Sequence, residues 1–284
     1  MRRSVELFEE HESMTTLVEL TSAFEGIASM RIAQIRDQVL VSQQFFGDLW
    51  RIYRQLRVDE LFHFGRIQTN AQPINKELMI LITSEGSFSG DIDQRLVSAA
   101  IKEYNPDKNA IIVIGHHGAV LLGQRSISYV RSFKTPDKDM NINTAPLINE
   151  VKKYRSTVVY YAQYQSLMSQ DIKKIRLSAA VIERGSQVAD DSKEIINEAT
   201  YIFEPNAYAV VDHLESSMMQ IMLSEVILES KLAQYASRFK AMSVARSRAQ
   251  DYFSEVTALY NRARRQEKDE RLKEIINGLR KVQI

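Results

Sequence analysis

The chain has no cysteine among its 284 residues. Disulfide bonds, thiolate zinc sites and cysteine nucleophiles are therefore excluded, and the composition is typical of a reducing compartment. No apolar run approaches the ~18 residues that a membrane-spanning helix needs. Residues 1–12 lack an apolar signal core and are rich in acid, so we expect the mature protein to start here, in a cytoplasm.

An excess of charge of either sign is also lacking. Lysine and arginine number 37 and aspartate and glutamate 36, which leaves a net charge of +1. This balance gives no reason to expect nucleic acid or another charged polymer as a partner. Hydrophobic residues make up 44% of the chain, as in an ordinary globular protein.

Helix-breaking residues are confined to the middle of the chain. The five prolines lie between Pro73 and Pro205, and Gly278 is the one glycine after Gly185. Proline costs ~3 kcal/mol and glycine ~1 kcal/mol inside a helix. We therefore predict three domains: an N-terminal helix over 1–72, a globular domain over 73–204 and a C-terminal helix over 205–284.

The C-terminal segment carries the clearest periodicity. From Val211, alternate steps of three and four residues meet an apolar side chain at fourteen of sixteen positions, Glu225 and Arg246 being the exceptions. Such a 3.5-residue repeat is the seam of a left-handed coiled coil. The positions are Val211, Leu214, Met218, Ile221, Glu225, Leu228, Leu232, Tyr235, Phe239, Met242, Arg246, Ala249, Phe253, Val256, Tyr260 and Ala263.

A similar seam near the N-terminus offers a partner for this helix. Its spacing is irregular around Ala28, which predicts a stutter that locally unwinds the supercoil. The positions are Leu17, Leu20, Phe24, Ala28, Ile32, Ile35, Val39, Phe46, Leu49, Tyr53 and Leu56, with Ser42 as a polar exception. Two seams at opposite chain ends predict an antiparallel intrachain pair. A homodimeric coiled coil is the alternative.

The middle of the chain predicts a partly parallel sheet covered by helices. Strands of β-branched and aliphatic residues alternate there with helical stretches. We predict strands over 78–83, 110–115, 127–133, 157–161, 175–182 and 201–203, and helices over 91–104 and 145–154. The predicted fold class is thus an α/β head plus a long antiparallel two-helix coiled coil formed by the N- and C-terminal segments.

The candidates for chemistry are few. Residues 83–91 follow a strand and open a helix, as a phosphate-binding loop does, but they lack the Gly-Lys-Ser/Thr of a P-loop. His116 and His117 follow a strand without a carboxylate at suitable spacing, and His11 lacks the second histidine of a zinc protease helix. We therefore predict no catalytic, cofactor-binding or metal-binding residue, and no cofactor.

Several motifs resemble those of F-type ATP synthase gamma subunits. Residues 201–205 (YIFEP) resemble the junction that opens the family's C-terminal helix, and 228–242 (LESKLAQYASRFKAM) are similar to its following segment. Residues 260–264 (YNRAR) and 274–278 (EIING) resemble motifs nearer its C-terminus, and 81–84 (LITS) match a strand of its head. Near the N-terminus, 21–24 (TSAF) stand where the family carries KITKAM.

The resemblance implies a non-catalytic central-stalk rotor. The paired helices would enter a ring of alpha and beta subunits, and the head would dock on the c-subunit ring with the epsilon subunit. The complex would lie at the cytoplasmic face of a bacterial cell membrane, with this chain peripheral. The implied partner contacts are Thr21, Ala23 and Phe24 on the first helix, with Arg262, Arg264 and Arg265 on the second.

Three other interpretations remain open at this point. One is a scaffold protein that dimerises through its helices. Another is an α/β enzyme with helical arms, and the last is a stalk subunit of a divergent rotary ATPase.

Overall fold

The computed structural model describes residues 4–55, 74–86, 88–136, 142–186, 202, 204 and 206–282. They form two compact units, residues 29–237 and residues 1–28 with 238–284. The helices are α1 (Ser4–Gln55), α2 (Ile92–Glu103), α3 (His116–Gln124), α4 (Ala145–Val151), α5 (Leu177–Ser186) and α6 (Ala207–Val282). The strands are β1 (Ile74–Ile82), β2 (Asn109–Ile114), β3 (Arg131–Phe133), β4 (Tyr154–Tyr164) and β5 (Gln170–Arg176).

The larger unit is built on a five-stranded mixed sheet with the strand order β3-β2-β1-β4-β5. β1 pairs in parallel with β2 and with β4, β3 runs parallel to β2, and β5 is the antiparallel edge strand. The three central strands are buried over most of their length, as a sheet covered on both faces requires. The predicted partly parallel sheet is confirmed.

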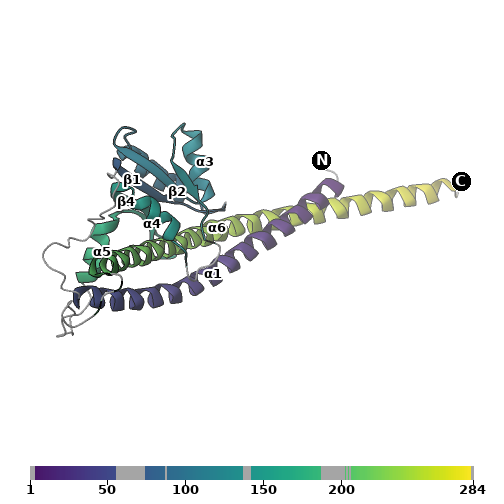
Figure 1. The fold of residues 1–284 in the computed structure, drawn as a ribbon. Helices are drawn as coiled ribbons and strands as arrows, with labels where there is room; N and C mark the ends of the chain where they lie inside the picture. Colours follow the sequence, from purple (N-terminus) through teal and green to yellow (C-terminus); the bar gives the residue numbers. More distant parts are fainter. Residues whose placement is uncertain are drawn as a thin grey trace. The chain divides into compact units, whose positions relative to one another are not determined.

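Alternate side chains of the central strands pack into two separate hydrophobic cores. Met79 and Leu81 face α2 and α3, where they meet Leu96 and Leu122. Their neighbours Leu78, Ile80 and Ile82 point to the other face, as the period of two along a strand dictates. Figure 1 shows α4, α5 and α6 on that second face of the sheet.

The second core joins the sheet to the long helices. Phe46 and Trp50 of α1 lie in one cluster with Met218 and Met219 of α6 and with the even-numbered side chains of β1. Phe46 and Trp50 stack with their rings 6.2 Å apart, and the Tyr53 hydroxyl donates to Glu215 Oε1 over 3.2 Å. Within this unit, α1 therefore packs against α6 of the same chain.

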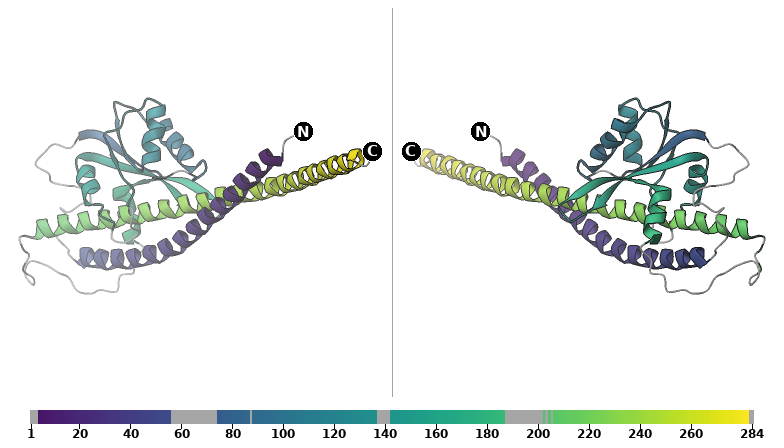
Figure 2. Two further views of the ribbon diagram at one scale, coloured as in Figure 1. Left: turned by 90° about the vertical axis from the view of Figure 1, so that its right-hand side faces the viewer. Right: turned by 90° about the vertical axis from the view of Figure 1, so that its left-hand side faces the viewer.

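The smaller unit consists of the N-terminal turns of α1 and the distal half of α6, and Figure 2 shows them in purple and yellow-green. The His11 ring lies 4.8 Å from Phe253 and 5.9 Å from Tyr260, and Phe8 lies 5.8 Å from Tyr260. Residue numbers rise along α1 as they fall along α6. The antiparallel intrachain pair predicted from the two seams is confirmed.

The seam of α6 is the predicted one. Of its sixteen positions, all but Arg246 are buried or half-buried. The helix begins one residue after Asn206, whose side-chain oxygen accepts a hydrogen bond of 2.8 Å from the Ala209 backbone N–H and caps the first turn.

The seam predicted for the start of α1 is wrong by one residue. Leu17, Leu20 and Phe24 are exposed to 41%, 51% and 36%. The inward side chains are instead buried or half-buried with regular steps of three and four, so the stutter predicted at Ala28 is absent. They are Leu7, His11, Met14, Val18, Thr21, Glu25 and Ala28. The prediction failed because α1 carries two apolar stripes, and hydrophobicity alone does not say which one faces α6.

Two further predictions in the head differ from the structure. The strand predicted over 175–182 is mostly helix, since β5 ends at Arg176 and α5 begins at Leu177. α3 was not predicted, because its sequence contains two glycines and an apolar run without helical periodicity. The strand predicted over 201–203 lies largely outside the described residues. Among the described helices, none has a segment long and apolar enough to cross a membrane.

Candidate functional site

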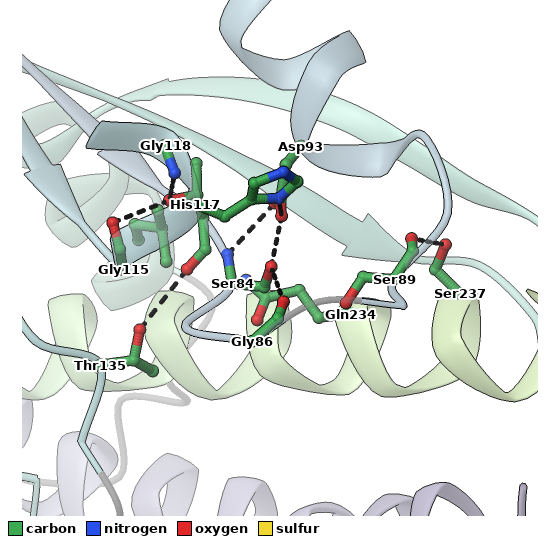
Figure 3. Close-up of polar contacts among 12 residues, drawn as sticks. Ser84, Gly86, Ser89, Asp93, Gly115, His117, Gly118, Thr135, Gln234 and Ser237 are labelled. Atoms are coloured by element: carbon green, nitrogen blue, oxygen red, sulfur yellow. Dashed lines mark hydrogen bonds and ion pairs between the residues drawn. The ribbon is translucent and has the colours of Figure 1, made fainter. Parts of the chain in front are cut away.

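The loop after β1 lies where an α/β sheet would hold a ligand, outside the carboxyl ends of its parallel strands. Asp93, in the first turn of α2, is 2% exposed and lies at the centre of the polar contacts of this loop. Asp93 Oδ1 accepts a 3.2 Å hydrogen bond from the Ser84 backbone N–H, and Oδ2 accepts another from the Ser84 hydroxyl. The same Oδ2 lies 2.8 Å from Nδ1 of His117 at the start of α3, as Figure 3 shows.

This arrangement differs from a nucleophilic triad. A triad needs the serine hydroxyl on one imidazole nitrogen and the carboxylate on the other. Here Ser84 and His117 both bond to one oxygen of Asp93, and the Ser84 side chain also donates to the Gly86 carbonyl over 2.9 Å. Ser84 is 1% exposed, which leaves no approach for a substrate. The network therefore joins β1, α2 and α3 as a structural contact.

Two backbone N–H groups at the start of α3, beside this loop, are already bonded within the protein. At the start of α3, His117 N–H donates to Ser84 O over 3.1 Å, and Gly118 N–H donates to Thr83 Oγ1 over 3.0 Å. Gly115, with φ of 96°, stands so close to the loop that a Cβ would lie 2.2 Å from Thr83 O. The first N–H groups of α3 and the space at Gly115 are thus used to join the loop to α3.

α6 covers the same edge of the sheet. Ser237 Oγ donates to Ser89 O over 2.7 Å, and Ser230 Oγ donates to Ile82 O over 3.3 Å. Lys231 Nζ donates to Pro136 O over 2.8 Å. Figure 3 shows the Ser89–Ser237 contact between the loop and the helix. The carboxyl end of β1 and the loop after it are therefore in contact with this chain's own helix.

Another buried polar cluster lies between α6, α5 and β4. Glu225, one of the two charged seam positions, is 8% exposed, and burial raises its pKa to about 7. Arg184 of α5 opposes this shift in the pKa of Glu225, and the carboxylate of Glu229 adds to it. Burial, together with the charge and hydrogen bond of Glu229, also raises the pKa of Tyr161. From the sequence, Glu225 was identified only as a charged residue that interrupts the apolar seam of α6.

A groove of about 640 Å³ runs beside the paired helices of the larger unit. Phe45 and Leu49 of α1 line it from one side, and Leu214, Ile221 and Leu228 of α6 from the other. Its polar lining consists of hydroxyl, amide and imidazole groups without a formally charged side chain. Elsewhere, the described residues contain no cluster of three histidine or acidic side chains that could hold a metal ion.

The partner-contact residues predicted from the sequence all lie in the smaller unit. Thr21 is 6% exposed and faces α6, and its hydroxyl donates to the carbonyls of Leu17 and Val18 in its own helix. Ala23 and Phe24 are exposed on the outer face of α1. The exposed residues on α6 are Arg262, Arg264 and Arg265.

The structure adds an outward apolar stripe to this surface. Ile27 is 46% exposed and lies three residues after Phe24, which continues the spacing of Leu17 and Leu20. Sequence reasoning found three of these residues but assigned them to the seam. The set of inward residues that starts at Leu7 lies on a different face of the helix. Its spacing of three and four residues is unbroken, although some of its members are polar, and this spacing would have corrected the assignment.

Comparisons with known proteins cover nearly the whole chain. The family model described as ATP synthase matches residues 6–281. A gamma chain of Chlorobaculum parvum ATP synthase is 21% identical over 275 residues, 92% of each chain. One from Mycoplasmoides gallisepticum is 23% identical over 286 residues, 95% of this chain and 96% of that one.

Solved structures share the fold at lower sequence identity. A rotor chain of Euglena gracilis mitochondrial ATP synthase is 16% identical, with a TM-score of 0.61 over 93% of this chain and 98% of that one. A chain of the central stalk and c-ring of the Tetrahymena thermophila mitochondrial ATP synthase is also 16% identical. Its TM-score is 0.57, over 80% of this chain and 99% of that one.

Proposed function

The chain belongs to the ATP synthase family, and we propose that it is the gamma subunit of such an enzyme, the central-stalk rotor. The observation that supports this function best is the long antiparallel pair of α1 and α6, formed within one chain and joined to an α/β head. The likeness extends over 92% and 96% of two gamma chains that it matches. A gamma subunit is a non-catalytic part of its complex.

A rotor of this kind acts through contacts rather than through chemistry. Two helices present different side chains in different directions, so three identical neighbours around them meet different surfaces at any moment. Each contact changes the state of a neighbour only by its difference in affinity for the alternative conformations. In the proposed mechanism, rotation brings each catalytic beta subunit in turn against a different face of the stalk.

The surface of the smaller unit offers two chemically distinct faces for such contacts. Ala23 and Phe24 lie on the exposed side of α1 beside the apolar Leu17, Leu20 and Ile27. On α6, the exposed arginines Arg262, Arg264 and Arg265 supply positive charge. Arginine forms strong, directional ion pairs with carboxylates, so we propose acidic loops of the beta subunits as their partners. Thr21 is proposed to act from beneath this surface by holding the helix in place.

The head is the proposed docking site for the rest of the rotor. In this arrangement it contacts the c-subunit ring together with the epsilon subunit, and the chain lies at the cytoplasmic face of a bacterial cell membrane. The family likeness to bacterial gamma chains supports this location.

Affinity purification from the native cells followed by mass spectrometry tests the assembly. We expect the alpha, beta and epsilon subunits and the c-ring subunit to copurify with the tagged chain. Recovery of the chain alone, or of a stable homodimer by sedimentation, would contradict the proposal. The homodimer is disfavoured because the chain's own α1 already covers the seam of α6 in both units.

Residues 83–91 provide a second test, against the interpretation as an α/β enzyme. The N–H groups of Ser84, His117 and Gly118 bond within the protein, so we expect no saturable binding of ATP or ADP to the purified full chain by calorimetry. Saturable binding that is lost on changing Gly118 would instead favour a nucleotide site in the head.

A further inference from the structure

One edge of the sheet in the head carries an excess of positive charge. Because β1, β2, β3 and β4 run parallel, their amino ends lie together with the C-termini of α2, α3 and α4. This surface, the basic edge, contains eight lysines and arginines and four acidic residues, a net charge of +4 in a chain whose total is +1. It consists of residues 74–77, 102–108, 125–131 and 150–156.

The opposite edge of the sheet lacks this charge, since it contains two acidic residues and one lysine. It consists of residues 82–91, 115–118, 133–136 and 163–170. This second edge contacts the later turns of α6 in the larger unit through Ser230 and Ser237. On the basic edge, Lys152 Nζ donates instead to Asp212 Oδ2 near the start of α6, over 3.3 Å. The positive charge is therefore concentrated at the end of the head where α6 begins.

Three cations of the basic edge are available to a partner. Lys102, Lys108 and Arg155 are exposed, and within the part of the chain that the structure describes they form no ion pair. Lys102 lies in the last turn of α2, where positive charge complements the helix dipole. Lys108 and Arg155 lie outside the helices, so the dipoles do not account for them.

Large apolar side chains are exposed on the same edge. Val130 is 59% exposed, Ile74 44% and Tyr129 39%. The sheet holds two of them in place, since the backbone N–H of Ile74 donates to Lys153 O and that of Val130 to Ile111 O, each over 2.8 Å. The basic edge thus presents cations and apolar groups together on an ordered surface.

We propose that the basic edge binds the surface of a membrane that contains anionic phospholipids. Such lipids attract lysine and arginine without requiring a fixed geometry, and aromatic and aliphatic side chains insert among their headgroups. Peripheral binding needs more than one such contribution, and this edge supplies both. An acidic protein surface would also attract the cations, so binding to lipid vesicles alone distinguishes the two partners.

Cosedimentation of the full chain with vesicles tests this binding. We expect the chain to bind vesicles of equal parts phosphatidylcholine and phosphatidylglycerol, and to remain in solution with phosphatidylcholine alone. Raising the salt from about 0.1 M to about 1 M should release most of the bound chain, because the screening length falls from about 10 Å to about 3 Å. A chain that stays in solution with the anionic vesicles at low salt would overturn the proposal and leave an acidic protein as the partner.

Removal of the three available cations tests whether the basic edge is the surface that binds. Each cation near an anionic membrane accounts for about a fivefold change in partitioning, so Lys102→Gln/Lys108→Gln/Arg155→Gln should weaken binding by about tenfold or more. The melting temperature should stay nearly unchanged, because all three side chains are exposed.

A matched control removes the same residue types from exposed positions of α6 in the smaller unit. Arg248→Gln/Lys268→Gln/Lys273→Gln should bind the anionic vesicles as the original chain does. An equal loss of binding in this control would overturn the proposal, because a lower total charge would then suffice.

The absence of cysteine allows the insertion to be observed directly. A single cysteine in Val130→Cys would carry an environment-sensitive fluorophore, whose emission should shift to the blue on anionic vesicles. Val244→Cys, at a 45% exposed position on α6 in the smaller unit, should show no shift. An unshifted label at position 130, or equal shifts at both positions, would contradict binding through the basic edge. Copurification tests the rotor function separately, so a failure of vesicle binding leaves that function intact.

Discussion

His117 Nδ1 and Asp93 Oδ2 lie 2.8 Å apart, which links the first turn of α3 to the first turn of α2 at the edge of the sheet. Asp93 also binds the backbone and hydroxyl of Ser84, so three segments of the head meet on one buried carboxylate.

Replacement of Asp93 by alanine should therefore destabilise the head. The buried N–H of Ser84 would lose its acceptor, at a cost of about 1–3 kcal/mol, whereas the Ser84 hydroxyl would keep the Gly86 carbonyl as an acceptor. Urea denaturation should show a lower midpoint for Asp93→Ala, and a smaller decrease for Asp93→Asn. His116→Ala, at the exposed neighbouring residue, is the control and should leave the midpoint nearly unchanged.

The glycines of α3 and its cap should respond in opposite directions to alanine. At Gly115 the positive φ and a Cβ contact of 2.2 Å with Thr83 O leave no room, so Gly115→Ala should cost about 2–3 kcal/mol. At Gly123 nothing lies within 4 Å of the added Cβ, and Gly123→Ala should gain up to about 1 kcal/mol. Thermal unfolding of both variants tests this; equal changes would contradict the close packing at Gly115.

Glu225 should make the stability of the larger unit depend on pH. Burial raises its pKa to about 7, above its unfolded value, so the native state holds a proton that the unfolded state releases from about pH 4.5 upward. The free energy of unfolding should consequently fall as the pH rises through this window, by up to about 3 kcal/mol in total.

Denaturation of Glu225→Gln at several pH values isolates this contribution. The variant cannot ionise at this position, so its stability should fall less steeply between pH 5 and pH 8. Glu255→Gln, at an exposed position on α6, should keep the slope of the original chain. Parallel curves for the original chain and Glu225→Gln would show that the buried carboxyl does not titrate in this range.

Removal of the positive charges at Arg264 and Arg265 should weaken coupling between ATP hydrolysis and rotation in the reconstituted complex. The expected cause is the loss of ion pairs with acidic loops of the beta subunits, and the effect should shrink as salt screens the original contacts. Single-molecule rotation measured against ATP turnover gives the coupling. Arg248→Gln/Arg271→Gln removes the same charge at other exposed positions on α6, and an equal loss there would argue against a specific contact.

The two long helices were predictable because their signals are local and repeated. The absence of proline before Pro73 and after Pro205 removes the strongest helix breaker from both ends. The seam of α6 was read correctly since one stripe clearly dominates it. The apolar strand cores of β1, β2 and β4 were found as well, because buried parallel strands form uninterrupted aliphatic runs.

The wrong predictions concern segments in which two local structures are nearly equally favourable. On α1, the stripe through Leu17 and the stripe through Met14 and Val18 both have coiled-coil spacing, and only packing against α6 selects between them. Around Arg176, strand and helix propensities are similar, and the antiparallel pairing of β5 with β4 ends the strand there. The Asp93 network could not be predicted, because it joins residues whose proximity depends on the sheet order.

The sequence alone determined that this chain has two long helical ends around an α/β middle, because proline placement and heptad repeats act within single segments. It also carried the family resemblance, which lies in short motifs. Tertiary structure decided which face of α1 is buried and that α6 covers the edge of the sheet. It also decided that Glu25 meets Arg246. These outcomes depend on contacts between segments far apart in the sequence, 148 residues for Ser89 and Ser237, where packing, and not local propensity, sets the free energy.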